Sequence, residues 1–183
     1  MKTIFLLTLF AFLPTAFAQT YVSKLSEATF SFKGTLLTKG TNNRPAVTLR
    51  ETTSGQTLSI VMEVKHFEFP DSYQRDEFNE TFMESHYFPQ IRISGMLKEK
   101  IDLNVNGIYI VNFPAKVTMR AVSQTVNFKT RIEVQNKELK LNLEERLNLS
   151  DYLIPYSGEG SEIGKDAVFM LNSNLQSIQV YNR

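Results

Sequence analysis

The sequence contains no cysteine, which excludes a disulfide framework and leaves the burial of apolar side chains to hold the fold together. It also contains no tryptophan and only two histidines, against 14 phenylalanines and 7 tyrosines. No linker, internal repeat or low-complexity tract divides the chain. The apolar content therefore comes from phenylalanine and aliphatic residues, a composition suited to lining an apolar interior.

Residues 1–18 have the features of a signal peptide. Lys2 supplies the initial positive charge, and Ile4 to Leu13 form an apolar run too short to span a bilayer comfortably. Ala16-Phe17-Ala18 matches the A-x-A cleavage signal. We expect cleavage, so that the mature protein begins at Gln19 and is periplasmic or secreted. The alternative is an uncleaved membrane anchor. A lipoprotein is excluded, because its cleavage site requires a cysteine.

The remaining residues, 19–183, are expected to form a single domain, because 165 residues (183 minus 18) suit one core. Without Lys2 the chain has 19 basic and 19 acidic side chains, a net charge of zero. Such a balance gives no general attraction to nucleic acid or to an anionic membrane surface. We expect no nucleic-acid partner and no stable membrane insertion after cleavage.

One segment predicts a helix in an otherwise strand-rich chain. Phe78, Phe82 and Met83 have helical spacing, and Asp71 with Gln74 makes a plausible capping box. Pro89 then ends helical geometry and starts a strand. We expect one helix near residues 72–86.

The rest of the chain reads as about eight or nine antiparallel strands that bury one face each. Strands are expected at Ala28–Leu37, Ala46–Arg50, Leu58–Lys65, Ile91–Gly95, Ile108–Arg120, Val126–Val134, Leu139–Leu149 and from Ala167 to about Val180, with a turn at Lys39–Asn43. Pro114 interrupts the longest strand and predicts an edge, a bulge or a corner. So many short strands in one small domain indicate a sandwich or a barrel. Of these, a closed antiparallel barrel of about eight strands removes exposed edges and has room for a small ligand.

Several segments, in this order, resemble the YceI family of exported bacterial proteins. They are Leu58–Phe69 (LSIVMEVKHFEF), Glu77–Pro89 (EFNETFMESHYFP), Pro114–Ser123 (PAKVTMRAVS), Leu147–Ile154 (LNLSDYLI) and Ile163-Gly164-Lys165. The resemblance covers roughly Phe30 to Leu175 and rests on the order and spacing of these segments. It implies a mainly β, lipocalin-like barrel with a long apolar cavity that holds a polyisoprenoid, such as a quinone or a related lipid.

The chain departs from the family pattern at two places. Ala121-Val122-Ser123 stands where the family often has Gly-Val-Thr. Glu145 is in phase with Leu143 and Leu147, where the family usually has an aromatic residue. Glu145 marks a bulge or points a carboxylate into the cavity. The bulge is favoured, because an unpaired buried carboxylate is costly.

The sequence offers little for catalysis. His66 and His86 flank the strand–helix unit near Glu68, Asp71 and Glu84, but zinc sites need closely spaced ligands, and no H-x-x-x-H motif occurs. Asp151 and Glu159 have no pattern that places them together. The Ser150–Asp166 loop is long enough for a lid. We expect no catalytic residues, no metal and no enzyme activity.

Alternating apolar residues form the expected interior. From periodicity alone these rows fill the barrel as a packed core, whereas the family resemblance implies that they line a lipid cavity. Phe78 and Phe82 on the helix would then help to line or close the cavity, and Met62, Met83 and Met119 would adapt to a flexible tail. The candidate ligand-binding residues are Leu58, Ile60, Met62, Val64, Phe78, Phe82, Met83, Ile91, Ile93, Met119, Val126, Phe128, Ile132, Leu141 and Leu143.

Two functions follow from these alternatives. The first is an exported binding protein that holds a polyisoprenoid or other long-chain lipid as a carrier, a store or a sink, with no cofactor besides a bound isoprenoid or quinone-like lipid. The second is a filled barrel that acts through its outer surface as a secreted stress or interaction protein. A large exposed apolar patch or a reproducible homodimer would favour the second function.

Overall fold

The computed structural model describes residues 19–154 and 163–178. The predicted signal peptide, residues 1–18, lies outside the described residues, as do residues 155–162 and 179–183. Within the described ranges no helix combines the length and the apolar character needed to cross a membrane.

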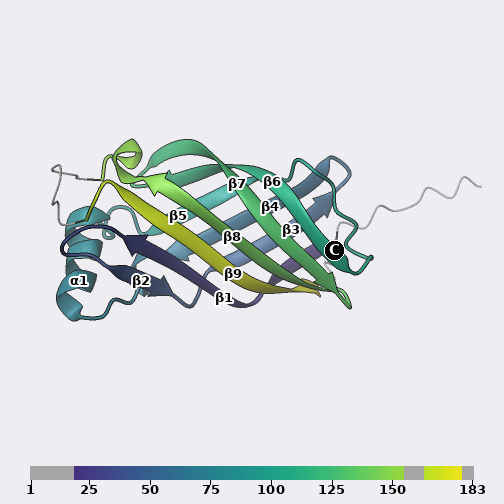
Figure 1. The fold of residues 1–183 in the computed structure, drawn as a ribbon, viewed down its shortest axis with the longest axis horizontal. Helices are drawn as coiled ribbons and strands as arrows, with labels where there is room; N and C mark the ends of the chain where they lie inside the picture. The colour runs from purple at the N-terminus through teal and green to yellow at the C-terminus, as the bar shows by residue number, and fades with distance from the viewer. Residues whose placement is uncertain (1–18, 155–162, 179–183) are drawn as a thin grey trace, which may run out of the picture.

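Eight antiparallel strands close into a barrel, as predicted (Figure 1). The first and last strands close the ring along their whole length, from Thr20 opposite Ile178 to Phe32 opposite Ala167. A ninth strand, β2 (Lys39–Asn42), pairs beside the end of the first. The barrel strands are β1 (Thr20–Phe32), β3 (Ala46–Thr52), β4 (Gly55–Glu63), β5 (Gln90–Met96), β6 (Gly107–Met119), β7 (Val122–Gln135), β8 (Glu138–Asn148) and β9 (Asp166–Ile178).

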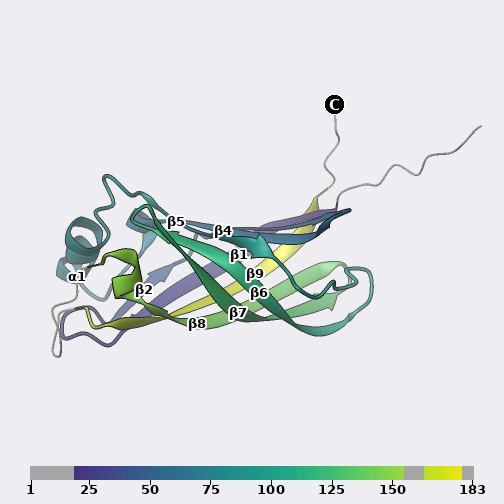
Figure 2. The same ribbon diagram turned by 90° about the horizontal axis from the view of Figure 1, so that it is seen from above.

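The predicted helix is present but shorter than expected. It comprises α1 (Ser72–Glu77) and a wider helical turn, η2 (Phe78–Phe82), and it sits across one end of the barrel (Figures 1 and 2). The Asp71 carboxylate accepts a hydrogen bond from the backbone N–H of Gln74 at 2.8 Å, as the capping box predicts. A short helical turn, η1 (Val64–His66), precedes α1, and another, η3 (Leu149–Tyr152), follows β8.

Pro114 marks the edge of the β5–β6 ladder, one of the three outcomes predicted for it, and Asn112 before it accepts a hydrogen bond from the Lys98 N–H at 2.9 Å. β5 pairs with β6 only over Ala115–Thr118, so Pro114 and the residues before it have no β5 partner. A Cβ atom on Gly95 would collide with the carbonyl oxygen of Pro114. Glycine at position 95 therefore permits the close approach of the two strands where their pairing begins.

Two strand predictions were wrong. β1 begins at Thr20 rather than Ala28, because its first half carries Ser26 at an inward position and shifts register between Ser23 and Leu25. The first half of β1 therefore lacks a regular alternation of apolar and polar residues. The expected turn at Lys39–Asn43 contains strand β2, where the Asn42 side chain donates to the carbonyl oxygen of Glu63 at 3.0 Å.

The barrel wall is interrupted between β7 and β8. Their pairing stops at Lys129 opposite Glu144, although β7 extends to Val122 and β8 to Asn148. η3 lies against the unpaired part of β7, where the Gln124 side chain donates to the carbonyl oxygen of Asp151 at 2.9 Å. The wall is thus completed by a helical turn where the ladder is absent.

Candidate functional site

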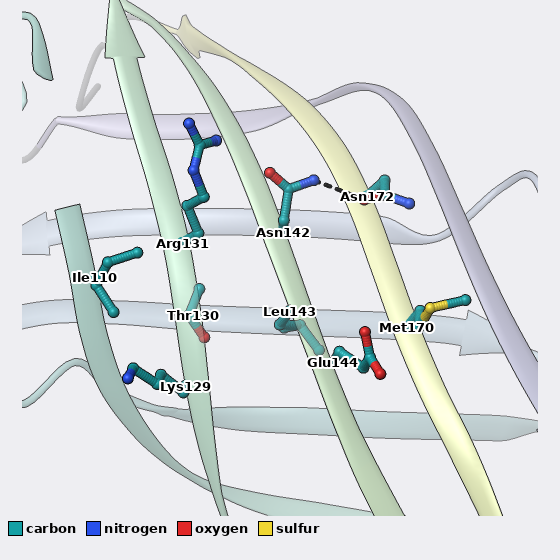
Figure 3. A pocket seen from close by; sticks show the side chains of 9 residues that line it. All are labelled: Ile110, Lys129, Thr130, Arg131, Asn142, Leu143, Glu144, Met170 and Asn172. Atoms are coloured by element: carbon teal, nitrogen blue, oxygen red, sulfur yellow. Dashed lines mark hydrogen bonds between the residues drawn. The ribbon is translucent and has the colours of Figure 1, made fainter. Parts of the chain in front are cut away.

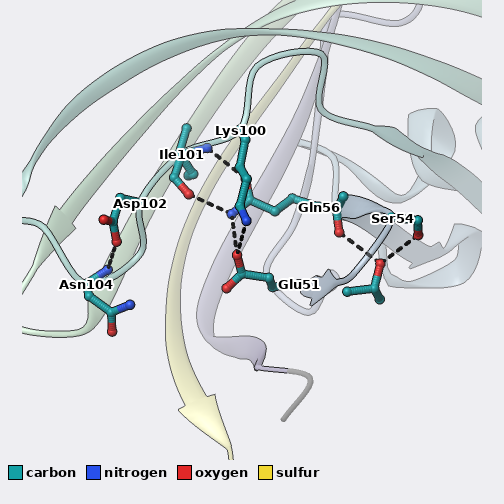
Figure 4. A network of polar contacts seen from close by, with 9 residues as sticks. Glu51, Ser54, Gln56, Lys100, Ile101, Asp102 and Asn104 are labelled. Carbon is teal, nitrogen blue, oxygen red and sulfur yellow. Dashed lines mark hydrogen bonds and ion pairs between the residues drawn. The ribbon is translucent and has the colours of Figure 1, made fainter. Parts of the chain in front are cut away.

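The end of the barrel opposite the helix, called here the loop end, is closed by the segment between β5 and β6. The buried Gln56 side chain donates to the Ile101 carbonyl oxygen at 2.7 Å and accepts from the Ile101 N–H at 2.9 Å (Figure 4). Leu97 and Leu103 of the same segment are buried. Because the backbone N–H and carbonyl groups of Ile101 both have hydrogen-bond partners, the segment closes this end of the barrel without an unsatisfied polar group at Ile101.

The end that carries α1, called here the helix end, is filled with aromatic side chains. The Phe30 ring lies 5.0 Å from Phe169 and 5.5 Å from Phe67, between ring centroids. Phe78 of η2 approaches Phe67 at 5.5 Å and Phe69 at 5.0 Å. Phe78 also approaches Phe32 of β1 at 5.9 Å, so these tilted contacts pack the helix against the end of the barrel. The Gln74 side chain of α1 accepts a hydrogen bond from the Thr38 N–H at 3.2 Å.

An apolar cavity lies at the helix end. The space open to the centre of a water molecule is only about 10 Å³, about enough for one water. Nine apolar side chains from the strands, the helical segments and the residues flanking 155–162 line it: Phe30, Phe32, Phe78, Met83, Ile91, Met119, Leu149, Ile154 and Ile163. The cavity is therefore closed around its own side chains.

All but one of the predicted ligand-binding residues are buried in the interior. The exception is Val126, which is partly buried beside the unpaired part of β7. Four of them line the cavity: Phe78, Met83, Ile91 and Met119. The others pack elsewhere in the core: Leu58, Ile60, Met62, Val64, Phe82, Ile93, Phe128, Ile132, Leu141 and Leu143. Contact of either group with a ligand stays a prediction.

Sequence reasoning did not include five of the lining residues. Phe30 and Phe32 were recognised as one side of the first strand, and Leu149 as part of the leucine series, so periodicity contained the signal. Ile154 and Ile163 lie outside the strands, where no periodicity places a side chain in a cavity.

A guanidinium group bridges the elements around the cavity. The Arg120 Nη2–H donates to the Glu84 Oε1 atom, and the Nη1–H donates to the Leu153 carbonyl oxygen, both at 2.7 Å. Arg120 belongs to the turn between β6 and β7, Glu84 follows η2, and Leu153 follows η3. We call these three residues the clasp. The Arg120 side chain is only 13% exposed, and its Nε atom has no hydrogen-bond partner.

Glu145 does not mark a bulge, contrary to the favoured prediction. β8 and β9 pair without a register shift through Glu145, which faces Phe169. Glu145 therefore occupies an inward position of the strand, but it is half-buried beside the β7–β8 interruption. Its carboxylate accepts a hydrogen bond from the backbone N–H of Arg146 at 3.0 Å, which gives that N–H a partner where the β7–β8 pairing is absent.

The polar residues considered for chemistry do not converge. His66 is half-buried with an unpartnered Nδ1 atom, whereas exposed His86 packs its ring edge-on against Tyr87. Within residues 19–154 and 163–178, no group of three or more potential metal ligands gathers. Glu159 and most of the predicted lid lie outside the described residues. Burial, with a smaller effect of the Asp151 charge, raises the pKa of Tyr152 to about 12.

A second hollow, of about 320 Å³, lies on the outer face of β6 to β9 (Figure 3). Charged and amide side chains such as Lys129, Arg131 and Glu144 line much of it, and the Asn142 side chain donates to Asn172 at 2.6 Å. Arg131 also pairs with Glu133 at 3.1 Å. This hollow has the mixed polar character of a solvated strand face, in contrast to the cavity.

No family model and no curated protein matches the sequence. The fold matches BcnA of Burkholderia cenocepacia with a TM-score of 0.68 at 10% identity, over 81% of this chain and 95% of that one. It matches a polyisoprenoid-binding domain from Saccharophagus degradans at 0.64 and 10% identity, over 86% and 98%. The YCEI protein of Campylobacter jejuni matches at 0.53 and 13% identity, over 84% and 85%. The predicted resemblance to YceI-like proteins is thus confirmed at the level of the fold.

Proposed function

We propose that this protein binds a polyisoprenoid or another long-chain lipid in its apolar interior at the helix end. The observation that carries the proposal is the cavity itself, which nine apolar side chains line without a polar one. Burial of a tail there would contribute about 0.8 kcal/mol for each CH₂ group removed from water. The polyisoprenoid-binding domain from Saccharophagus degradans, which has a similar fold, supports the same ligand class.

A tail needs more room than the closed cavity offers, since ligand sites usually measure about 300–1,000 Å³. Met83 and Met119 line the cavity and have unbranched, flexible side chains that can change rotamer around a tail. Phe78 of η2 contacts Phe32, Phe67 and Phe69 through its aromatic ring, and these rings can slide against one another without breaking hydrogen bonds. Binding is therefore expected to widen the cavity by moving η2 and these methionines.

The protein is proposed to act after export, in the periplasm or outside the cell, as a carrier, a store or a sink without catalysis. The signal-peptide features of residues 1–18 support export. Native mass spectrometry of the protein from its own host, followed by organic extraction, tests the binding. One bound molecule of isoprenoid mass per chain is expected, and the same spectrum tests the predicted homodimer.

Two isosteric variants test the location of the site. Met119→Gln places an amide in the cavity and is expected to weaken lipid retention roughly tenfold or more, because burying an unpartnered amide costs about 1–3 kcal/mol. Met170→Gln is the matched control, since Met170 lines the outer hollow. If the protein stays empty when offered quinones and polyprenols, the barrel is filled by its own side chains, and the function moves to the outer surface.

A further inference from the structure

The clasp and the cavity are adjacent along the chain at three separate places. Met83 lines the cavity and precedes Glu84, Met119 lines it and precedes Arg120, and Ile154 lines it and follows Leu153. In each of these three segments, one residue lines the cavity and the residue next to it belongs to the clasp. The guanidinium group therefore links the three chain segments that contribute Met83, Met119 and Ile154 to the cavity.

The backbone of the clasp is strained. Glu84, Arg120 and Leu153 all have left-handed φ angles, of 47°, 47° and 56°. They are three of the six non-glycine residues with positive φ in the part of the chain that the structure describes. Glycine would adopt these angles without a steric penalty, whereas Glu84 and Arg120 retain side chains there. Backbone strain of this kind is retained at ligand clamps, where the interactions of the side chain outweigh the free energy cost of the strained φ angle.

The guanidinium group has unused binding capacity. It carries five N–H donors, of which one reaches the Glu84 carboxylate and one reaches the Leu153 carbonyl oxygen. The Nε atom is buried without a partner. The Glu84 side chain is 37% exposed, against 13% for Arg120, so the anion is the more accessible member of the pair. A planar donor group of this kind suits a phosphate or a carboxylate, which accepts two parallel hydrogen bonds.

We propose that Arg120 receives the anionic head group of an amphiphile whose tail occupies the cavity, and that the head group displaces Glu84. This inference rests on the proposed lipid-binding function and adds the charge of the ligand. In the ligand-free protein the Glu84 carboxylate occupies the position of the head group. A neutral head group cannot replace that charge, so a neutral lipid leaves Glu84 in place and gains nothing from Arg120.

Farnesyl monophosphate and farnesol test the inference, because they share one tail and differ only in the phosphate. Titration calorimetry of the mature wild-type protein is expected to show at least tenfold tighter binding of the phosphate ester. Arg120→Gln should reduce that preference to less than about threefold. Glu84→Gln should strengthen binding of the phosphate ester, since it removes the competing carboxylate.

Arg131→Gln is the matched control, because Arg131 also pairs with a glutamate but lies on the outer wall. It should leave the preference unchanged. Circular dichroism of each variant checks the fold, and Glu84→Gln still tests the idea if Arg120→Gln does not fold. Equal binding of both ligands would overturn the inference and leave the lipid-binding function standing. Binding of neither ligand would overturn both. Inorganic phosphate alone should bind far more weakly, and equally tight binding would mean that the site takes free anions rather than lipids.

Discussion

The two ends of the barrel are closed in different ways. At the loop end, Gln56 satisfies both backbone groups of Ile101, and none of the residues from Leu97 to Asn106 has a positive φ angle. At the helix end, contacts between aromatic rings dominate, three clasp residues are strained, and polar atoms of Arg120 and Tyr152 lack partners. Both ends bury apolar side chains, but of the two, in the part of the chain that the structure describes, it is the helix end that has buried polar atoms without hydrogen-bond partners.

This difference fits the proposed function, which places the binding of a lipid at the helix end and leaves the loop end to stabilise the barrel. A satisfied hydrogen-bond network has one low-energy arrangement, so the loop end has little reason to move. Apolar contacts are not directional, so side chains at the helix end can repack at small cost. A binding site needs that freedom, which places the movable parts of the protein beside α1 and η3.

The largest effect on stability is expected from Gln56→Leu at the loop end. The variant leaves the N–H and the carbonyl oxygen of Ile101 buried and unpaired, which should lower the free energy of unfolding by about 2–4 kcal/mol. Urea denaturation measures it. Lys100→Ala is the control, because its ion pair with Glu51 involves a highly exposed side chain and should contribute at most about 0.5 kcal/mol. Equal effects of the two variants would remove the distinction between the ends.

At the helix end, Tyr152 predicts a loss of stability at alkaline pH. Its pKa is about 12 in the folded protein and near 10 when unfolded, so the unfolded state loses its proton first. The stabilisation is complete below pH 10 and disappears as the pH rises from 10 to 12, by on the order of 1–2 kcal/mol.

Tyr152→Phe should flatten that part of the stability curve and change little at pH 7, since the hydroxyl has no partner. Burial also raises the pKa of Tyr21, so some alkaline loss should remain in the variant. An unchanged slope between pH 10 and 12 would show that Tyr152 is not the group responsible.

The smallest expected effects are gains at two hairpin turns, one at each end. Ala121 has φ 61° in the β6–β7 turn, and Lys137 has φ 65° in the β7–β8 turn. Ala121→Gly and Lys137→Gly should each raise the free energy of unfolding by about 0.5–1 kcal/mol, because glycine adopts these angles without a clash. Thermal unfolding measures both. Ala121→Gly leaves the clasp side chains intact, so a change in lipid selectivity would tie the turn to binding.

The strands with alternating apolar residues could be predicted from sequence, because a half-buried strand imposes a period of two on its own residues. Leu58, Ile60 and Met62 all face inward as expected. The first half of β1 was missed, since Ser26 occupies an inward position, where its hydroxyl forms a 2.6 Å hydrogen bond with that of Ser173, its partner on the adjacent strand β9. A polar pair of this kind is visible only when both strands are placed side by side.

The cavity and the clasp were less accessible to sequence reasoning. The period of a strand says which face is buried, but it does not say where along that face the packing is loose. Glu84, Arg120 and Leu153 come from three turns that share no local pattern, and they meet only because the barrel closes. The departure at Ala121 was a visible signal, since a residue that stands where glycine is usual points to a left-handed turn.

The interruption between β7 and β8 leaves one place in the barrel wall where no strand pairing has to break for the wall to open. Moving η3 outward breaks the hydrogen bonds of Gln124 to Asp151, of Arg120 to Leu153 and of Leu149 to Lys165. It breaks no pairing between β7 and β8, because these strands share none beyond Lys129 and Glu144. Amide hydrogens in the first half of β7 should therefore exchange with deuterium sooner than those in the second half. If the proposed lipid binds in the cavity, this opening gives it a path past η3 that leaves the other paired strands intact.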